Sequence, residues 1–227
     1  MKTIAIIPSG GIGSRILSSV PKQYVKVLGK ELIAYTLQVF QNCNLVDEII
    51  IPAQPSYFNL LKNIKEEFNL NKITKIIEGG KERQDSVYNG LQQLTLNNDD
   101  LVLVHDAARP LLSQTLLEKS IIEAKKYDSI VVAKKASDTL IKGDTIVNNY
   151  LDRTNIYYAQ TPQIFRYKIL LEAFELAIKN NFYGTDESML VKKARFDVTI
   201  VEGETTNFKV TNQSDLELLE LILKNTL

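Results

Sequence analysis

Short apolar runs recur along this chain and alternate with stretches of helical periodicity, and no other feature limits its possible folds so strongly. The runs lie at residues 4–7, 48–51, 73–77, 101–104, 130–133 and 198–201. Between them, apolar residues return every three or four positions, as in Leu116, Leu117, Ile121 and Ala124, which is the spacing of one helix face. Strands that alternate with helices predict an α/β fold with a doubly wound, mostly parallel sheet.

The length of the chain and its segment at about 136–158 bear on domain organisation. The 227 residues suffice for one large α/β domain, and no linker, repeat or low-complexity tract divides them. We therefore expect a single domain over residues 1–227. The segment at about 136–158 shows no helical period, but two extended stretches, 139–141 and 145–147, flank a turn at Lys142, Gly143 and Asp144. This pattern predicts a protruding β-arm, which either a second subunit or solvent would cover.

Charge and cysteine content exclude several classes of protein. The 27 basic and 27 acidic residues balance, so overall charge gives no reason to expect a nucleic-acid partner. No stretch approaches the roughly 18 apolar residues that a membrane span needs, and Cys43, the single cysteine, cannot form an internal disulfide. The N-terminus begins with a strand pattern instead of a targeting segment. We expect a cytoplasmic protein that binds no membrane.

The loop after the first apolar run concentrates glycines and cations. They are Gly10, Gly11, Gly13, Arg15 and Lys22. Glycines let backbone N–H groups approach an anion closely, and this turn follows a strand in the position where a doubly wound sheet binds phosphate. A dinucleotide fingerprint would need glycine where Ile16 stands, which disfavours an NAD-dependent oxidoreductase, and the P-loop pattern is absent. A tight connection with two solvated cations is the alternative interpretation.

The sequence "LVLVHDAARP" brings a second polar cluster to the end of a buried strand. Asp106 and Arg109 follow the apolar run and should reach the same sheet edge as the glycine loop. A carboxylate there can hold Mg²⁺ or a ribose hydroxyl, since Mg²⁺ takes one or two protein carboxylates and completes its shell with phosphates and water. His105, the only histidine, is assigned a structural role with a hydrogen bond to backbone.

Two further stretches could complete a nucleotide pocket. In "EGGKERQDSVYNGL", Gly79 and Gly80 form a strand-to-helix turn that could present backbone groups to a base, with Ser86 adding a hydroxyl; alternatively Asp85 caps the helix of an ordinary loop. In "TTNFKVTNQSDL", a short strand is expected with Lys209 at its centre, either exposed to solvent or acting as a third cation. Because three such turns share one sheet edge, a nucleotide pocket is favoured.

Taken in order, these stretches resemble the 2-C-methyl-D-erythritol 4-phosphate cytidylyltransferases of the non-mevalonate isoprenoid pathway. The motifs "PKQY", "DAARP" and "AQTPQ" carry most of the resemblance, which spans nearly the whole chain. It implies a Rossmann-like nucleotidyltransferase fold and transfer of a cytidylyl group from CTP to methylerythritol phosphate with Mg²⁺ as cofactor. It also implies a homodimer whose β-arms interlock.

The resemblance further assigns roles to individual residues. The catalytic cations would be Arg15, Lys22 and Lys209, and the nucleotide would be bound by Pro8, Ser9, Gly10, Gly11, Gly13, Gly80, Ser86, Asp106 and Ala107. Gly80 and Ser86 would contact cytosine, and Asp106 would hold the metal. The acceptor phosphate would meet Arg109, Thr139, Arg153, Thr161 and Thr185, some of them from the arm of the partner.

Departures from the family pattern leave the fine nucleotide preference open, and two other functions are alternatives. Ser9, Gly10 and Gly11 replace two alanines and a glycine, and Lys81 stands where an acidic residue is frequent. A sister group that makes CDP-ribitol from ribitol 5-phosphate shares "PKQ" and "QTPQ", although "DAARP" favours the methylerythritol enzyme. A nucleotide-binding module without catalysis is the other alternative. It is disfavoured because four charged groups directed at one phosphate exceed what a binder needs.

Overall fold

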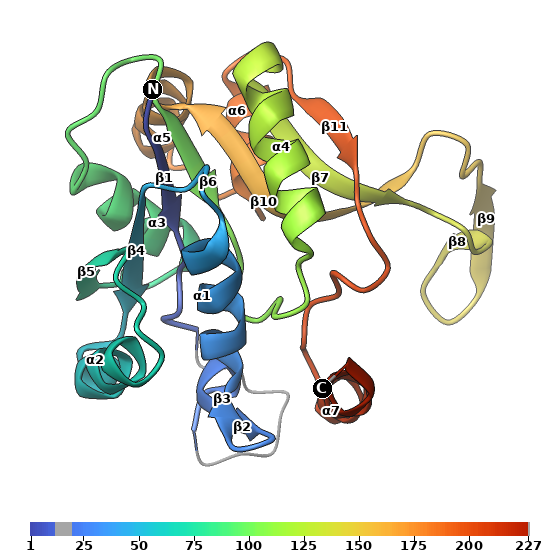
Figure 1. The fold of residues 1–227 in the computed structure, drawn as a ribbon. Helices are drawn as coiled ribbons and strands as arrows, with labels where there is room; N and C mark the ends of the chain where they lie inside the picture. Colours follow the sequence, from blue (N-terminus) through green and yellow to red (C-terminus); the bar gives the residue numbers. More distant parts are fainter. Residues whose placement is uncertain (12–19, 227) are drawn as a thin grey trace.

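The computed structural model describes residues 1–11 and 20–226, which form a sheet covered by helices on both faces (Figure 1). The strands of the main sheet are β1 (Thr3–Ile6), β4 (Glu48–Ala53), β5 (Ile73–Glu78), β6 (Leu101–Val104), β7 (Ser129–Lys135), β10 (Tyr157–Arg166) and β11 (Thr199–Glu202). The helices are α1 (Leu32–Asn42), α2 (Phe58–Glu67), α3 (Arg83–Gln92), α4 (Gln114–Tyr127), α5 (Tyr167–Lys179), α6 (Glu187–Lys193) and α7 (Gln213–Thr226), with short 3-10 turns η1 (Lys22–Tyr24) and η2 (Pro55–Tyr57). Within the described ranges, no helix has the length and apolar character needed to cross a membrane.

The seven strands follow the order β11-β7-β10-β6-β1-β4-β5. All neighbours run parallel except β10, which is antiparallel to both β6 and β7. This arrangement confirms the predicted α/β fold with a mostly parallel sheet. The carboxyl ends of β1, β5 and β6 therefore meet at one edge, where ligands of such sheets bind. The single domain over residues 1–227 stays a prediction.

Alternating strand residues build a separate core on each face of the sheet. In β6, Leu101 and Leu103 pack with α1, α2 and α4, whereas Val102 and Val104 pack with α3, α5 and α6. In Figure 1, α1 and α4 lie on the near face and α5 and α6 on the far face. Because a strand buried on both faces needs apolar residues at every position, the unbroken apolar runs of the sequence follow directly from this double cover.

A third, smaller core fixes the C-terminal helix beside the glycine loop. Val27 of β2 (Lys26–Val27), which pairs with β3 (Lys30–Glu31), packs with Ala108, Val210 and Leu219. This cluster joins α7 to the loop after β6. Lys209, the neighbour of Val210, is thereby held near that loop, although the predicted strand around it is wrong: residues 207–210 form no strand, and Val210 donates a single backbone hydrogen bond to Ala108.

The β-arm consists of β8 (Leu140–Gly143) and β9 (Val147–Leu151), which project away from the body of the molecule (Figure 1). The predicted hairpin is present, but its turn is shifted to residues 144–146 and its second strand begins two residues late. A Cβ on Gly143 would overlap the carbonyl of Ile146, so the close approach of these two residues requires glycine. Gly143 therefore lies at the end of β8, next to the turn and not within it. Almost every residue of the arm is exposed.

Candidate functional site

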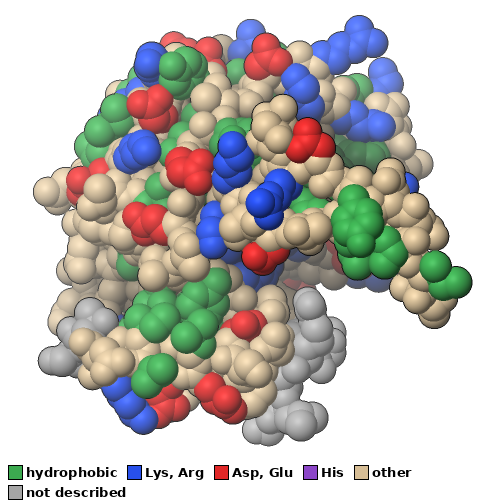
Figure 2. Space-filling view, turned by 90° about the vertical axis from the view of Figure 1, so that its right-hand side faces the viewer, with side chains coloured by type: hydrophobic (Ala, Val, Ile, Leu, Met, Phe, Trp, Pro, Cys, Tyr) green, Lys and Arg blue, Asp and Glu red, His purple; other side chains and the backbone are tan. Residues whose placement is uncertain are grey.

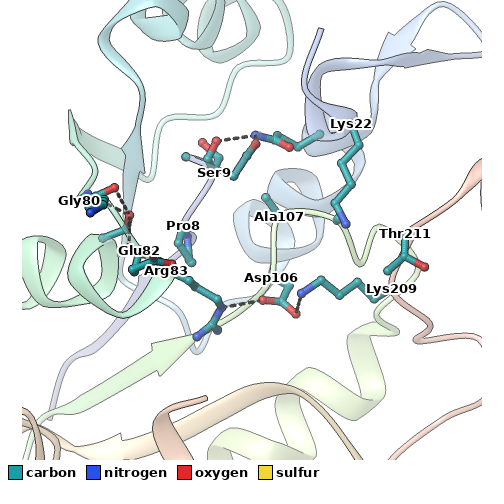
Figure 3. Close-up of a pocket in the computed structure, with 16 residues that line it drawn as sticks. Pro8, Ser9, Lys22, Gly80, Glu82, Arg83, Asp106, Ala107, Lys209 and Thr211 are labelled. Atoms are coloured by element: carbon teal, nitrogen blue, oxygen red, sulfur yellow. Dashed lines mark hydrogen bonds and ion pairs between the residues drawn. The ribbon is translucent and has the colours of Figure 1, made fainter. Parts of the chain in front are cut away.

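A cavity of about 280 Å³ opens at the carboxyl edge of the sheet, between the glycine loop, the start of α3 and the loop after β6. Ten predicted site residues line it: Pro8, Ser9, Gly10, Gly11, Lys22, Gly80, Ser86, Asp106, Ala107 and Lys209. Gly13 and Arg15 lie outside the described residues. The structure thus gathers segments far apart in the sequence around one cavity (Figure 3).

The first part of the glycine loop is held from behind by amide side chains. Gln23 of η1 donates through Nε2 to the carbonyls of Ser9 (2.5 Å) and Gly11 (3.0 Å), and Gln54 donates to Gly10 (2.9 Å). These hydrogen bonds hold residues 9–11 along the cavity. The Ser9 hydroxyl, unusual for the resembled family, lies 2.9 Å from the Tyr24 hydroxyl and is buried, so it supports the loop from within the protein.

Lys22 and Lys209 lie on the same wall of the cavity. Lys22 Nζ donates to the carbonyl of Val210 (2.7 Å), the residue that follows Lys209. Figure 3 shows both lysines entering the cavity from the same side, with Lys209 reaching Asp106. The small core around Val210 therefore holds Lys22 and Lys209 close to each other.

Asp106 lies at the floor of the cavity and contacts three cations. Its carboxylate oxygens lie 3.1 Å from Arg83 Nε, 3.0 Å from Lys209 Nζ and 3.4 Å from Arg109 Nε. Burial alone would raise the pKa of Asp106, but the charges of Arg83, Lys209 and Arg109 outweigh it and hold that pKa well below its usual range. The three cations outnumber the two carboxylates that contact them, Asp106 and Glu187, so the cavity floor keeps a net positive charge, which suits an anionic ligand.

The donor set fits a metal ion that arrives with a phosphate ligand. Asp106 supplies a buried carboxylate, and Mg²⁺ in nucleotide enzymes uses one or two carboxylates together with substrate phosphates and water. No group of three or more His, Cys, Asp or Glu side chains in the described part of the chain is arranged to hold a metal ion by itself. A metal at Asp106 would therefore depend on the ligand for most of its shell.

The turn between β5 and α3 forms the opposite wall of the cavity. The N–H group of Gly80 donates to Ser86 Oγ (2.9 Å), and Ser86 Oγ donates to the Glu82 carbonyl (3.1 Å). A Cβ on Gly80 would overlap Asp85, so only glycine allows this tight approach. Asp85 accepts from the Glu82 N–H (3.0 Å) at the start of α3. The turn therefore has both the predicted pocket position and the helix-capping contact of the alternative.

A buried hydrogen-bond chain supports Asp106 from behind. The Asp106 N–H donates to Thr161 Oγ1 (3.1 Å), which lies 3.0 Å from His105 Nδ1, while His105 Nε2 lies 3.2 Å from the Arg109 carbonyl. This confirms the predicted hydrogen bond of His105 to backbone. Burial lowers the pKa of His105 to about 3, so the ring is neutral at pH 7. In the neutral ring, Nε2–H donates a hydrogen bond to the Arg109 carbonyl, and Nδ1 accepts a hydrogen bond from the Thr161 hydroxyl.

Five residues predicted to meet an acceptor phosphate do not line the cavity. Arg109 and Thr161 are buried behind Asp106, and Arg109 Nη1 donates to the Asn207 carbonyl (2.8 Å). Thr139 and Arg153 lie exposed at the base of the arm, where Arg153 donates to the Ser137 carbonyl. Thr185 is exposed in the loop before α6. The roles of all five residues stay predictions.

Sequence reasoning missed Gln23 and Arg83, although both left a signal. Gln23 lies within "PKQY", and its amide holds the glycine loop. Arg83 is the first residue of α3, where the helix dipole disfavours a cation. Such a residue needs a carboxylate partner, and Arg83 has two, Asp106 and Glu187.

Comparisons with known proteins agree on one family. The profile of the family described as 2-C-methyl-D-erythritol 4-phosphate cytidylyltransferase matches residues 3–225. A protein of that name from Clostridioides difficile is 43% identical over 220 residues, which cover 96% of this chain and 92% of the relative. Another from Syntrophus aciditrophicus is 38% identical over 226 residues, covering 98% and 96% of the two chains.

Solved structures show the same similarity. The Francisella tularensis 2-C-methyl-D-erythritol 4-phosphate cytidylyltransferase superposes with a TM-score of 0.84 at 33% identity and covers 97% of this chain and 99% of its own. The Thermus thermophilus enzyme of the same name gives a TM-score of 0.82 at 29% identity, covering 99% and 100% of the two chains. The similarity thus extends over the whole fold, including the segments that build the cavity.

Proposed function

The chain belongs to the 2-C-methyl-D-erythritol 4-phosphate cytidylyltransferase family, and we propose that the cavity is where it carries out the reaction of that family. The chain is a nucleotidyltransferase of isoprenoid biosynthesis, and it transfers a cytidylyl group from CTP to 2-C-methyl-D-erythritol 4-phosphate. The convergence of Lys22, Lys209 and Asp106 on one cavity supports this site most strongly. Its cytoplasmic location stays a prediction.

The nucleotide lies along the glycine loop with its base at the β5–α3 turn. Backbone groups of Ser9, Gly10 and Gly11 follow the triphosphate, and Lys22 and Lys209 provide positive charge. Arg15 and Gly13 are proposed to complete this wall on the basis of the sequence alone. Cytosine meets the backbone at Gly80 and the hydroxyl of Ser86. The contacts that these two groups make with each other in the structure would be exchanged for contacts to the base.

Asp106 and Ala107 contact the ribose, and Asp106 would hold Mg²⁺ together with phosphate oxygens. When bound, Mg²⁺ supplies a fixed positive charge that offsets the negative charge of the phosphates. The three cations around Asp106 keep its carboxylate ionised and oriented. The carboxylate therefore stays available as a ligand throughout the physiological pH range.

Arg109 and Thr161, which lie behind Asp106, are proposed to support the acceptor site. Thr185 and, from the partner subunit of a homodimer, the arm residues Thr139 and Arg153 complete its site. Exposed apolar side chains on the arm support this arrangement, because solvent is an unfavourable environment for them. Ile146 is 76% exposed and Tyr150 is 67% exposed. Figure 2 shows apolar patches on the side of the molecule from which the arm projects.

In the reaction, a phosphate oxygen of the acceptor attacks the α-phosphorus of CTP. A bond forms between this oxygen and the α-phosphorus, the bond from the α-phosphorus to the bridging oxygen breaks, and pyrophosphate leaves. The main barrier is the approach of two anions, and fixed cations lower it. Lys22 and Lys209 supply this charge within the described residues. No general base is required because the attacking oxygen is already ionised, which agrees with a buried, neutral His105.

Pyrophosphate release tests this function. The protein is incubated with CTP and Mg²⁺ and with either methylerythritol phosphate or ribitol 5-phosphate. We expect release with the first acceptor at a clearly higher kcat/KM. Preference for ribitol 5-phosphate would assign the chain to the sister activity, and tight CTP binding without pyrophosphate release in the presence of either acceptor would indicate a non-catalytic module.

A further inference from the structure

Arg83 divides one guanidinium group between two carboxylates that belong to different parts of the molecule. Its Nε lies 3.1 Å from Asp106 Oδ1, while Nη1 and Nη2 lie 2.6 and 3.1 Å from the two oxygens of Glu187. Asp106 lies near the start of the loop after β6, and Glu187 is the first residue of α6. Figure 3 shows Arg83 reaching Asp106 from the side opposite to Lys209. The bridge therefore connects the cavity floor to α6.

The bridge is a strong interaction on its α6 side. The side chain of Glu187 is only 1% exposed, and a bidentate arginine–carboxylate pair fixes the plane of the guanidinium. Burial would lower the pKa of Arg83, but the charges of Glu187 and Asp106 outweigh it and raise that pKa above its usual value. Removing either carboxylate would leave a partly buried cation with one partner fewer.

The same end of α3 also holds the loop before α6. Gln84, which follows Arg83, donates through Nε2 to the Phe182 carbonyl (3.1 Å) and accepts from the Gly184 N–H at Oε1 (2.8 Å). The next residue, Thr185, is exposed and is a proposed acceptor contact. Two consecutive side chains of α3 thus hold the segment 182–188, but only Arg83 also contacts the cavity.

On the far side, this segment is anchored to the sheet. Gln163 of β10 donates to Asp186 Oδ2 (2.9 Å) and accepts from the Ser188 N–H (2.8 Å). Asp186 in turn accepts from the Met189 N–H (2.9 Å) and caps α6. The segment 182–188 is therefore held by hydrogen bonds at both ends, and Arg83 links it through Glu187 to Asp106 at the cavity floor.

We propose that Arg83 is a positioning residue that couples nucleotide binding at Asp106 to the order of the segment 182–188, which carries Thr185. This inference rests on the proposed function, because it takes Asp106 as part of the nucleotide site and Thr185 as part of the acceptor site. A nucleotide orders Asp106 and adds negative charge on the cavity side of Arg83. The guanidinium group of Arg83 then loses conformational freedom. Less conformational entropy is therefore lost when its ion pair with Glu187 orders the segment. By reciprocity, an ordered acceptor segment favours nucleotide binding.

Hydrogen exchange of peptides that cover 182–189 tests the coupling directly. We expect CTP with Mg²⁺ to slow their exchange in the wild-type protein by about fivefold or more, the lower end of typical coupling between sites. Arg83→Lys keeps the charge but cannot contact both carboxylates with a planar fork, so this nucleotide-dependent slowing should disappear. Glu187→Gln, which leaves every cavity-lining side chain in place, should also abolish it.

Gln84→Ala is the matched control. Gln84 holds the same segment but has no contact with Asp106. Its loss should speed exchange of the segment with and without nucleotide, while the ratio between the two conditions stays near the wild-type value. Loss of that ratio in Gln84→Ala, with retention in Arg83→Lys, would overturn the assignment to Arg83.

Calorimetric titration of the wild-type protein with CTP and Mg²⁺ separates the inference from the function on which it rests. CTP binding without any change in exchange of 182–189 overturns the coupling and leaves the proposed function intact. Absence of CTP binding overturns both. Melting temperatures of Arg83→Lys and Glu187→Gln are compared with that of Gln84→Ala. If either variant is destabilised as much as Gln84→Ala and still shows the nucleotide-dependent slowing, its residue has no coupling role.

Discussion

The cavity floor and the β-arm are built in opposite ways. At the cavity, Asp106 has three cationic partners, its backbone N–H is bonded to Thr161, and that residue contacts a buried histidine. The arm is a two-stranded ribbon of which nearly all residues are exposed. A two-stranded hairpin of this kind has little stability of its own in water.

The difference indicates which half of the site a single chain can complete. The proposed nucleotide side is held by contacts within one chain, so the charges of its described residues are already oriented before a ligand binds. The arm carries Thr139 and Arg153 on a support that the rest of its own chain does not cover. We infer that the nucleotide side works within one subunit, whereas the acceptor side requires a second copy.

The largest effect should come from a cation on the nucleotide side. Lys22→Ala should lower turnover by about a hundredfold or more, the scale seen when one preorganised charge donor is lost. Steady-state kinetics at saturating CTP measures the change, and circular dichroism checks folding. Lys26→Ala is the matched control, because the exposed Lys26 does not line the cavity; its Nζ lies 3.5 Å from the buried carboxylate of Glu31. Near-normal turnover in a folded Lys22→Ala protein would contradict the role of this wall.

A second prediction concerns how the stability of the protein depends on pH through the buried contacts behind Asp106. His105 stays neutral in the folded protein down to a pKa of about 3, whereas an unfolded histidine takes up its proton near 6.5. Below about pH 6.5 the unfolded chain therefore binds more protons, and stability falls as the pH drops. Between pH 7 and pH 5 the free energy of unfolding should fall by about 2 kcal/mol.

Urea unfolding at the two pH values measures this loss. Because the chain has one histidine, His105→Asn should remove most of the pH dependence in that window. Lys142→Ala, on the arm, should leave it unchanged. An equal decline in His105→Asn and wild type would show that the buried chain behind Asp106 is not the source of the pH dependence.

A smaller effect, limited to the KM for the acceptor, is expected for a substitution in the arm. Arg153→Ala should raise the KM for the acceptor by about tenfold, as for a lost hydrogen bond to a charged group, while CTP affinity stays unchanged. Initial rates with each substrate varied separately measure the split. Lys142→Ala removes another cation from the same arm and should change neither constant. If both affinities fell together in Arg153→Ala, the arm would not act on the acceptor.

The nucleotide side was the more predictable of the two regions. Its residues follow strands with unbroken apolar runs, and parallel strands bring their carboxyl ends to one edge whatever the details of packing. Asp106 and Gly80 could therefore be assigned to one cavity before their contacts were known. The expected strand around Lys209 is wrong, because the alternation of Phe208, Lys209 and Val210 reflects packing of Val210 in the small core and of the partly buried Phe208 against it.

The remainder depended on contacts that leave no local pattern. β10 was missed because Pro162 lacks an N–H group and the strand register shifts between Ala159 and Gln163, so the segment reads as a loop. Glu187 is far from Arg83 in sequence, and only the packing of α6 against α5 and α3 brings the two together. Long-range ion pairs of this kind cannot be read from spacing.

Subunit mixing tests most directly whether the acceptor side is completed by a second copy. Lys22→Ala and Arg153→Ala chains are co-expressed, and turnover is measured at an acceptor concentration well below the raised KM. A mixed dimer would hold one site with an intact nucleotide wall and an intact arm from its partner, so random pairing should restore about a quarter of wild-type activity per chain. Activity that stays at the average of the two separate variants would contradict the account.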